Sequence, residues 1–336
     1  MSDESSGPSR LRRLWAVLLV LGVVTVAASL LAGSGDLADE ELRSTFLRLR
    51  AWRTAAAFLA GSALAVGGVL VQGLFRNPLA SPSIIGATAG ANLGGMTTLL
   101  VFELLLGGAS LGPIPPEMLL PAGCMLGAIG SLLLLLAIVR NRASLVAVLL
   151  TGFILSSLFA SLGGLLTSMG QDTYELGRAM VSFTLGGVDG KGPRHVALAL
   201  PLVVGGVLAA WAWGRHLDLL LSGEEEARSL GLDVKRARRW CIAWTATLTA
   251  AAVAIGGNVS FVGLVVPHAL RPWVGVEHRR LVPAACLCGG VFLVACDVIT
   301  RVLPATGIIP LGVVTGLVGA PVFLWLLVRY RMGTVE

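Results

Sequence analysis

The sequence predicts an all-α integral membrane protein with ten transmembrane helices. Of its 336 residues, 55% are hydrophobic and only 13% are charged, whereas a soluble domain usually carries about 25% charged residues. The mean hydropathy is +0.85. A soluble core cannot absorb so much apolar surface, so we expect the lipid bilayer to be the solvent for most of the chain.

Long runs without Asp, Glu, Lys or Arg predict the individual helices, because a span needs about 20 apolar residues. In chain order these runs are 14–35, 54–75, 77–102, 118–139, 143–171, 196–213, 240–270, 281–296 and 302–328. The run 240–270 is too long for one span and holds Gly256-Gly257-Asn258 near its middle. We therefore expect two helices there, the second one short, joined by a tight extracytoplasmic turn.

The first run has two interpretations. It follows Arg10, Arg12 and Arg13 and ends in small residues, as a cleaved signal peptide does. However, a run of 22 residues is long for a signal core, which favours an uncleaved first helix. We expect a tail at 1–13, a transmembrane domain at 14–329 and a second tail at 330–336.

The distribution of basic residues predicts the orientation. With both termini in the cytoplasm, the cytoplasmic segments hold 17 basic residues and the outer segments hold 8. The positive-inside rule selects this arrangement. The net charge of +6 therefore reflects topology in a cell membrane, and no basic stripe with interleaved aromatic residues indicates nucleic acid.

Motifs of enzymes, cofactor sites and metal sites are missing from the sequence. The two lysines, Lys191 and Lys235, do not lie in a G-x-x-x-x-G-K-[ST] motif, so the chain is not expected to hydrolyse ATP itself. The five cysteines and four histidines have no metal-binding spacing, and we interpret the cysteines as small packing residues. Asp297 and Glu103 are the few deep acids that an ion-coupled secondary transporter could use.

One stretch, LSGEEEARSLGLDVKRARR at 221–239, contains nine charged residues between two apolar runs. Ser222 and Glu225 match a capping box, which predicts a helix starting at Ser222. Gly231 suits a left-handed helix stop, and Asp233 can cap a second short helix before the next span. The stretch is either a solvated loop that sets topology or a docking element for a cytoplasmic partner.

This stretch resembles the coupling segment of permease subunits in type II ATP-binding-cassette importers for ferric siderophores, haem and vitamin B12. Three further stretches resemble the same family in the same order: 50–94, 257–284 and 310–327. The resemblance implies a pair of identical or similar permeases, a cytoplasmic ATPase dimer, and an extracytoplasmic binding protein. It also implies a bacterial or archaeal inner or plasma membrane. Contact with the ATPase is implied for Ser222, Gly223, Glu224, Glu225, Ala227, Arg228 and Gly231.

The resemblance also implies that Arg50, Arg53 and Arg301 dock acidic residues of the binding protein. Interfacial anchoring is the alternative for Arg50 and Arg53, and an i,i+4 ion pair with Asp297 is the alternative for Arg301. This sequence departs from the family in having Ala51-Trp52 between the first two arginines. It also lacks an acidic residue before Pro310, which leaves the identity of the partner open.

Two further segments have open interpretations. The segment FRNPLASP (75–82) is either a helix break with Asn77 and Ser81 as caps or a second surface for the ATPase. The small polar residues of the run 143–171 indicate either close helix packing or, by resemblance, the wall of the central pathway. The pathway candidates are Thr151, Ser156, Ser157 and Ser161, with Ser144 near an inner gate. Taken together, we expect an iron-siderophore importer permease, with vitamin B12 or haem as alternative substrates.

Overall fold

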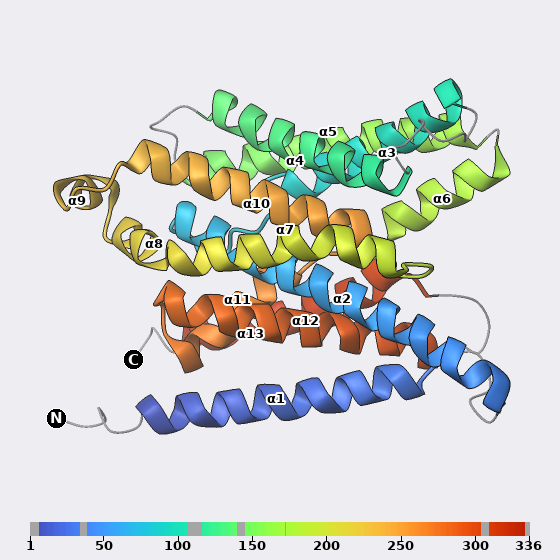
Figure 1. The fold of residues 1–336 in the computed structure, drawn as a ribbon. Helices are drawn as coiled ribbons and strands as arrows, with labels where there is room; N and C mark the ends of the chain where they lie inside the picture. Colours follow the sequence, from blue (N-terminus) through green and yellow to red (C-terminus); the bar gives the residue numbers. More distant parts are fainter. Residues whose placement is uncertain are drawn as a thin grey trace.

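The computed structural model describes residues 7–33, 39–106, 116–139, 145–171, 173–303 and 309–332 (Figure 1). Over these ranges the protein is helical and has no strand. The helices are α1 (Gly7–Leu31), α2 (Glu40–Leu74), α3 (Ala87–Leu106), α4 (Pro116–Ile138), α5 (Leu145–Gly170), α6 (Tyr174–Leu185), α7 (Pro193–Ala212), α8 (Gly214–Leu221), α9 (Glu224–Ser229), α10 (Val234–Gly256), α11 (Val262–Val274), α12 (His278–Val302) and α13 (Leu311–Met332). This confirms the all-α fold.

Within the described ranges, seven helices are long and apolar enough to cross a membrane: α1, α2, α4, α5, α7, α12 and α13. The remaining three expected spans correspond to α3, α10 and the short α11, which has 13 residues. The total of ten spans stays a prediction. The glycine turn between α10 and α11 lies where the sequence predicts it, because α10 ends at Gly256 and Gly257 has a φ of 65°.

The helix α2 forms the centre of the bundle. It packs against α7, α10, α11 and α12, and most of the residues from Ala56 to Gly73 are buried. Glycines allow this close packing: a Cβ atom on Gly61 would lie 2.2 Å from the carbonyl oxygen of Gly289, and one on Gly68 would lie 1.9 Å from that of Gly263. Such contacts are typical of membrane helices, where small residues let backbones approach.

Two outer groups of helices flank this centre (Figure 1). On one side α3, α4 and α5 pack together, and the contact between α3 and α4 again depends on glycine: a Cβ atom on Gly94 would lie 2.1 Å from the oxygen of Gly123. On the other side α1, α12 and α13 lie together. The helices α8 and α9 lie at the same end of the bundle as the start of α1 and the end of α13. We call this the inner end and the opposite one the outer end.

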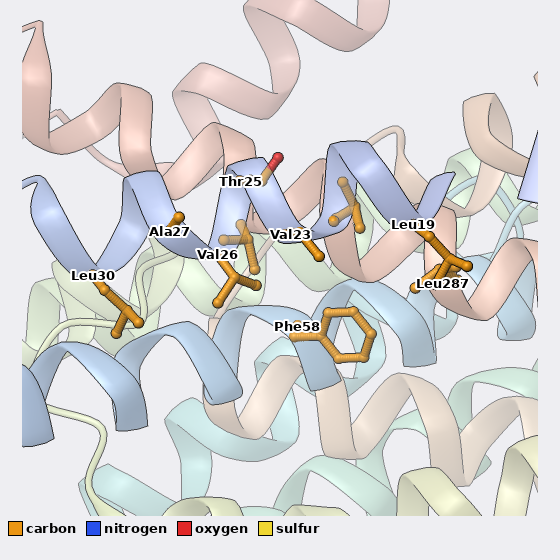
Figure 2. A pocket seen from close by; sticks show the side chains of 11 residues that line it. Leu19, Val23, Thr25, Val26, Ala27, Leu30, Phe58 and Leu287 are labelled. Atoms are coloured by element: carbon orange, nitrogen blue, oxygen red, sulfur yellow. The ribbon is translucent and has the colours of Figure 1, made fainter. Parts of the chain in front are cut away.

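The first helix is attached less closely than the others. It contacts α2 and α12, and an apolar groove of about 450 Å³ remains between these three helices. Figure 2 shows the side chain of Phe58 on α2 and those of Val23, Val26 and Leu30 on α1, which line this groove. In a membrane, lipid acyl chains are the surroundings of such a surface.

Several helix boundaries differ from the sequence expectations. The second helix begins at Glu40 instead of residue 54, because Asp39 accepts hydrogen bonds from the backbone N–H groups of Glu41 and Leu42 and so caps it. The helix α1 already begins at Gly7, inside the expected tail at 1–13, and α13 extends to Met332, inside the expected tail at 330–336. The uncharged run from residue 302 is divided, since Val302 ends α12 and Leu311 starts α13.

Candidate functional site

The charged stretch folds into a compact element at the inner end, formed by α8, α9 and the start of α10 (Figure 1). The helix α9 ends as the sequence predicts, at a left-handed glycine: Gly231 has a φ of 87°. The N–H of Gly231 donates to the carbonyl of Arg228 at 3.0 Å, and the N–H of Leu232 donates to that of Ala227 at 2.9 Å. This is the Schellman pattern, which satisfies the free carbonyls of the last turn.

The start of this element differs from the prediction. Ser222 does not cap a helix that begins there; it is the C-cap of α8. The N-cap of α9 is Gly223, whose φ is 126°, and its first turn carries Glu224, Glu225 and Glu226. Asp233 is a cap, as predicted, because its carboxylate accepts the N–H of Arg236 at 3.0 Å. However, it caps the continuous helix α10 and not a separate short helix.

Glu224 connects α9 to the start of α10. Its Oε1 lies 2.8 Å from Nη2 of Arg238 on α10, and its Oε2 lies 3.3 Å from Nη2 of Arg228 one turn along α9. Ala227, on the inward face of α9, is fully buried. Of the predicted coupling residues, Glu224, Ala227, Arg228 and Gly231 therefore make contacts within the element.

The opposite side of α9 faces the solvent. Glu225, Glu226 and Ser229 are exposed, and Leu230 is 61% exposed. An exposed leucine next to two carboxylates offers a polar contact surface with an apolar centre. Glu225 is thus available for a partner, whereas Glu224 is occupied within the chain.

An interaction that the sequence did not indicate attaches this element to the helix bundle. Oδ1 of Asp218 on α8 lies 2.6 Å from Nδ1 of His278 and 3.0 Å from its backbone nitrogen, at the first residue of α12. Burial raises the pKa of Asp218, but the hydrogen bonds with His278 outweigh this effect and hold the pKa below its ordinary value. His278 is buried against Gly73 of α2: a Cβ atom added to Gly73 would lie 2.7 Å from Nε2 of His278.

Aromatic packing completes the attachment. The ring of Trp213, between α7 and α8, stacks on that of Trp240 in α10 with centroids 4.6 Å apart. The guanidinium carbon of Arg279 lies 5.3 Å from the ring centroid of Trp211, within the range of a cation–π contact. The element at the inner end is therefore fixed to α2, α7, α10 and α12.

The segment 75–82 also lies at the inner end, where it forms turns and not the start of a helix. The side chain of Asn77 accepts the N–H of Leu79 at 2.9 Å, and that of Ser81 accepts the N–H of Ile84 at 3.2 Å. Both polar side chains are buried, and α3 begins only at Ala87. Arg76 and Pro78 are the exposed parts of this segment.

At the outer end, two of the predicted docking arginines converge on one buried carboxylate. The side chain of Asp297 is 1% exposed and lies 2.7 Å from Nη2 of Arg301, as the i,i+4 alternative predicts. It also accepts from Nε and Nη2 of Arg53 on α2, at 2.9 and 2.8 Å. Sequence reasoning missed this second pair, because 244 residues separate the partners.

The same cluster holds the end of α1. The guanidinium of Arg50 donates to the carbonyls of Leu30 and Leu31 at 2.9 Å each. Arg301 donates to the carbonyls of Ser29 and Ala32, also at 2.9 Å. Cations suit these positions because the last carbonyls of a helix carry partial negative charge.

Arg53 has one more partner, which faces outward. Its Nη1 contacts the carboxylate of Asp189, in the connection between α6 and α7. The side chain of Asp189 is 48% exposed, whereas that of Arg53 is 19% exposed. The predicted contact of the three arginines with a binding protein stays a prediction, and Arg53 has the most exposed side chain of the three.

The candidate pathway residues of α5 divide between two faces. Ser156 is directed toward the segment before α3, since its hydroxyl lies 3.2 Å from the carbonyl oxygen of Ser83 and 2.8 Å from that of Gly152 on α5 itself. Ser157 and Ser161 lie on the exposed face, and each donates to a carbonyl of its own helix. Thr151 is half-buried, and Ser144 lies outside the described residues.

The five cysteines are free thiols, and three of them are fully buried, which agrees with a packing role. In the described part of the chain no group of three or more His, Cys, Asp or Glu side chains is arranged to hold a metal ion.

Comparisons with known proteins show the family of this chain. The sequence model of the FecCD transport family matches residues 13–329. The chain is 37% identical to the Fe(3+) dicitrate transport system permease protein FecD of Escherichia coli (strain K12) over 295 residues, which covers 88% of each chain. It is 36% identical to the cobalamin import system permease protein BtuC of Halobacterium salinarum over 268 residues, or 80% of this chain and 69% of that one.

The fold has a solved counterpart. It is similar to an inward-facing ABC transporter of the metal-chelate type, with a TM-score of 0.80 and 30% identity over 95% of this chain and 99% of the other. The family match spans nearly every described helix, including the element at the inner end and the arginine cluster at the outer end. The chain belongs to the FecCD transport family.

Proposed function

We propose that this chain is the membrane-spanning permease of a type II ATP-driven importer that translocates a ferric siderophore. The observation that carries this proposal is the element at the inner end, in a chain of this family: an exposed α9 held by Glu224 and joined to α12 through Asp218 and His278. A cytoplasmic ATPase dimer that moves α9 would thereby move α12 and α2.

The choice of an iron chelate as substrate has two supports. One relative at 37% identity is named for Fe(3+) dicitrate transport. In addition, a groove of about 640 Å³ lies at the outer end between α6 and Pro310, and Arg178, Gln171, Tyr174 and Ser182 line it. Asp189 lines the groove as well, so the hydrogen-bonding groups of the groove stand beside one cation and one carboxylate, a lining that suits a polar metal chelate. Vitamin B12 and haem are the alternative substrates, since another relative is named for cobalamin import.

A second permease copy or a paralogue completes the pathway in this proposal. The helix α5 exposes Phe153, Ile154 and Leu158, and α13 exposes Leu317 and Leu324. An extracytoplasmic binding protein delivers the substrate to the outer end, where the cluster of Arg50, Arg53 and Arg301 lies. Charged groups at such a surface set the register and rate of association.

Reconstitution in liposomes tests the proposal. The chain is combined with the ATPase and binding protein encoded by neighbouring genes, and uptake of labelled ferric siderophore, cobalamin and haem is measured with and without ATP. We expect uptake of ferric siderophore that requires both ATP and the binding protein. Uptake of only cobalamin or only haem under the same conditions would reassign the substrate.

An ion-coupled secondary transporter is the distant alternative, and the same liposomes test it. Uptake that ignores ATP but follows an imposed proton or sodium gradient would contradict the importer proposal. Asp297, the deep acid that such a mechanism could use, is engaged by Arg53 and Arg301.

A further inference from the structure

The guanidinium group of Arg53 is shared between two carboxylates of different character. Its Nε and Nη2 atoms bind Asp297, whose side chain is 1% exposed. Its Nη1 edge, which faces outward, contacts Asp189, whose side chain is 48% exposed. One carboxylate is therefore an internal part of the bundle, and the other is accessible from the outer solution.

The inner pair fixes the position of Arg53. Asp297 binds Arg301 at the same time, and Arg301 in turn holds the carbonyls of Ser29 and Ala32 at the end of α1. Breaking a buried pair of this kind leaves an uncompensated charge inside the protein. The Nη1 edge of Arg53 is thus presented outward by a rigid support.

Without Asp189, the arginine cluster would carry a larger excess of positive charge. Arg50, Arg53 and Arg301 carry three positive charges, and Asp297 neutralises one of them. Asp189 supplies the second negative charge at the outer surface. A carboxylate from another protein could take this place without changing the net charge of the cluster, and an exposed ion pair contributes little to stability.

The backbone near Asp189 connects several helices of the outer end. The N–H of Gly187 donates to the carbonyl of Gly256 at 2.9 Å, and the N–H of Leu311 donates to that of Gly186 at 3.0 Å. Residues 186–189 therefore join the end of α6 to the turn after α10 and to the start of α13. Gly186, Asp189 and Pro310 also line the outer groove.

We propose that Asp189 is the internal occupant of a carboxylate-binding site on Arg53, and that an acidic side chain of the binding protein displaces it on docking. This inference rests on the proposed function, because it needs a protein partner at the outer end. Displacement frees the connection between α6 and α7 from α2, so docking is transmitted directly to the groove through which the substrate enters.

The affinity of the binding protein for the permease tests this inference. The permease is placed in lipid nanodiscs, and the Kd for the binding protein encoded by a neighbouring gene is measured by surface plasmon resonance. Asp189→Asn removes the competing carboxylate, so we expect the Kd to fall roughly three- to tenfold. Asp189→Glu retains a carboxylate and should remain near the wild-type Kd.

The matched control is Glu175→Gln, which removes one exposed negative charge from α6 at the same end of the protein. It should leave the Kd unchanged, whereas a general effect of surface charge would lower it as much as Asp189→Asn does. If the Asn variant does not elute as a monodisperse species, Asp189→Ser removes the same charge.

The variant Arg53→Ala tests whether the binding protein docks on Arg53 at all, separately from whether it displaces Asp189. We expect it to weaken binding, and the double variant with Asp189→Asn to bind no better than Arg53→Ala alone. If Arg53→Ala weakens binding but Asp189→Asn leaves the Kd unchanged, docking stands and the role of Asp189 is overturned. If Arg53→Ala has no effect, docking on Arg53 fails, and this inference fails with it.

Discussion

One oxygen of Asp218 contacts both the side chain and the backbone of His278: Oδ1 lies 2.6 Å from Nδ1 and 3.0 Å from the backbone nitrogen. A carboxylate of α8 thus binds a free N–H group at the start of α12, where the helix dipole favours negative charge. The exposed helix α9 follows α8 directly in the chain. This contact joins the helix that precedes the predicted ATPase-binding surface to α12 of the helix bundle.

The contact predicts a pH-dependent contribution to stability. The pKa of Asp218 lies below its ordinary value of 3.8, so its stabilising effect is complete above pH 5 and is lost as the pH falls through the lowered pKa. Asp218→Asn should reduce the free energy of unfolding by about 1–2 kcal/mol at pH 7. Thermal unfolding in detergent, followed by tryptophan fluorescence from pH 7 to pH 3, measures both effects.

Glu277→Gln is the control for this prediction, since Glu277 pairs with Arg280 nearby but its side chain is 48% exposed. It should change stability by less than about 0.5 kcal/mol. The difference between wild type and Asp218→Asn should shrink at low pH. A difference that stays constant down to pH 3 would contradict the assignment of a lowered pKa to this pair.

Asp297→Asn should destabilise the protein severely. It leaves the guanidinium groups of Arg53 and Arg301 without their shared buried carboxylate, and breaking a buried ion pair costs about 3–5 kcal/mol. We expect little folded protein in membranes, measured by fluorescence-detected gel filtration. Glu103→Gln, which removes a half-buried acid of α3, should elute like the wild type.

Where a glycine lies against the backbone of a neighbouring helix, we expect substitution by alanine to destabilise the protein. Gly68→Ala would place a Cβ atom 1.9 Å from the carbonyl oxygen of Gly263, so the two helices must separate. Overpacking of this kind costs about 1–3 kcal/mol or more, and the thermal midpoint should drop. Gly164→Ala is the control, because no atom lies within 4 Å of the added Cβ. Equal midpoints for the two variants would contradict the close approach of α2 and α11.

A charge reversal on the exposed side of α9 should abolish coupling to the ATPase while the protein still folds. Glu225→Arg reverses a charge that makes no contact holding α9 in place, so expression should be unchanged. ATPase co-purification and uptake should be abolished, because an interface that fits a carboxylate rejects a guanidinium. The same charge reversal on α6, Glu175→Arg, should leave co-purification intact.

Gly231→Pro tests the same element through the backbone. Proline cannot adopt the φ of 87° and lacks the N–H that donates to the carbonyl of Arg228. We therefore expect α9 to be misplaced and uptake to be lost, while α10 still forms from its cap at Asp233. Normal uptake in both Glu225→Arg and Gly231→Pro would refute the coupling hypothesis.

Sequence patterns predicted those parts of the protein that depend on local chemistry. Uncharged runs indicated the helices, the glycine turn after α10 was placed correctly, and Gly231 and Asp233 have the backbone roles that their residue types favour. The i,i+4 pair of Arg301 and Asp297 was also predictable, because both residues lie on one helix. Ser222 was assigned wrongly, since a glycine with a positive φ starts α9 instead.

The sequence by itself determined the all-α membrane fold, the family and the inner charged stretch, because hydropathy, capping residues and motifs act over a few turns of helix. Only the tertiary structure brought Arg53 to Asp297 and Asp189, and Asp218 to His278. These pairs join residues from different helices. Their contacts depend on how closely glycine-lined backbones pack, and no local pattern in the chain encodes that distance.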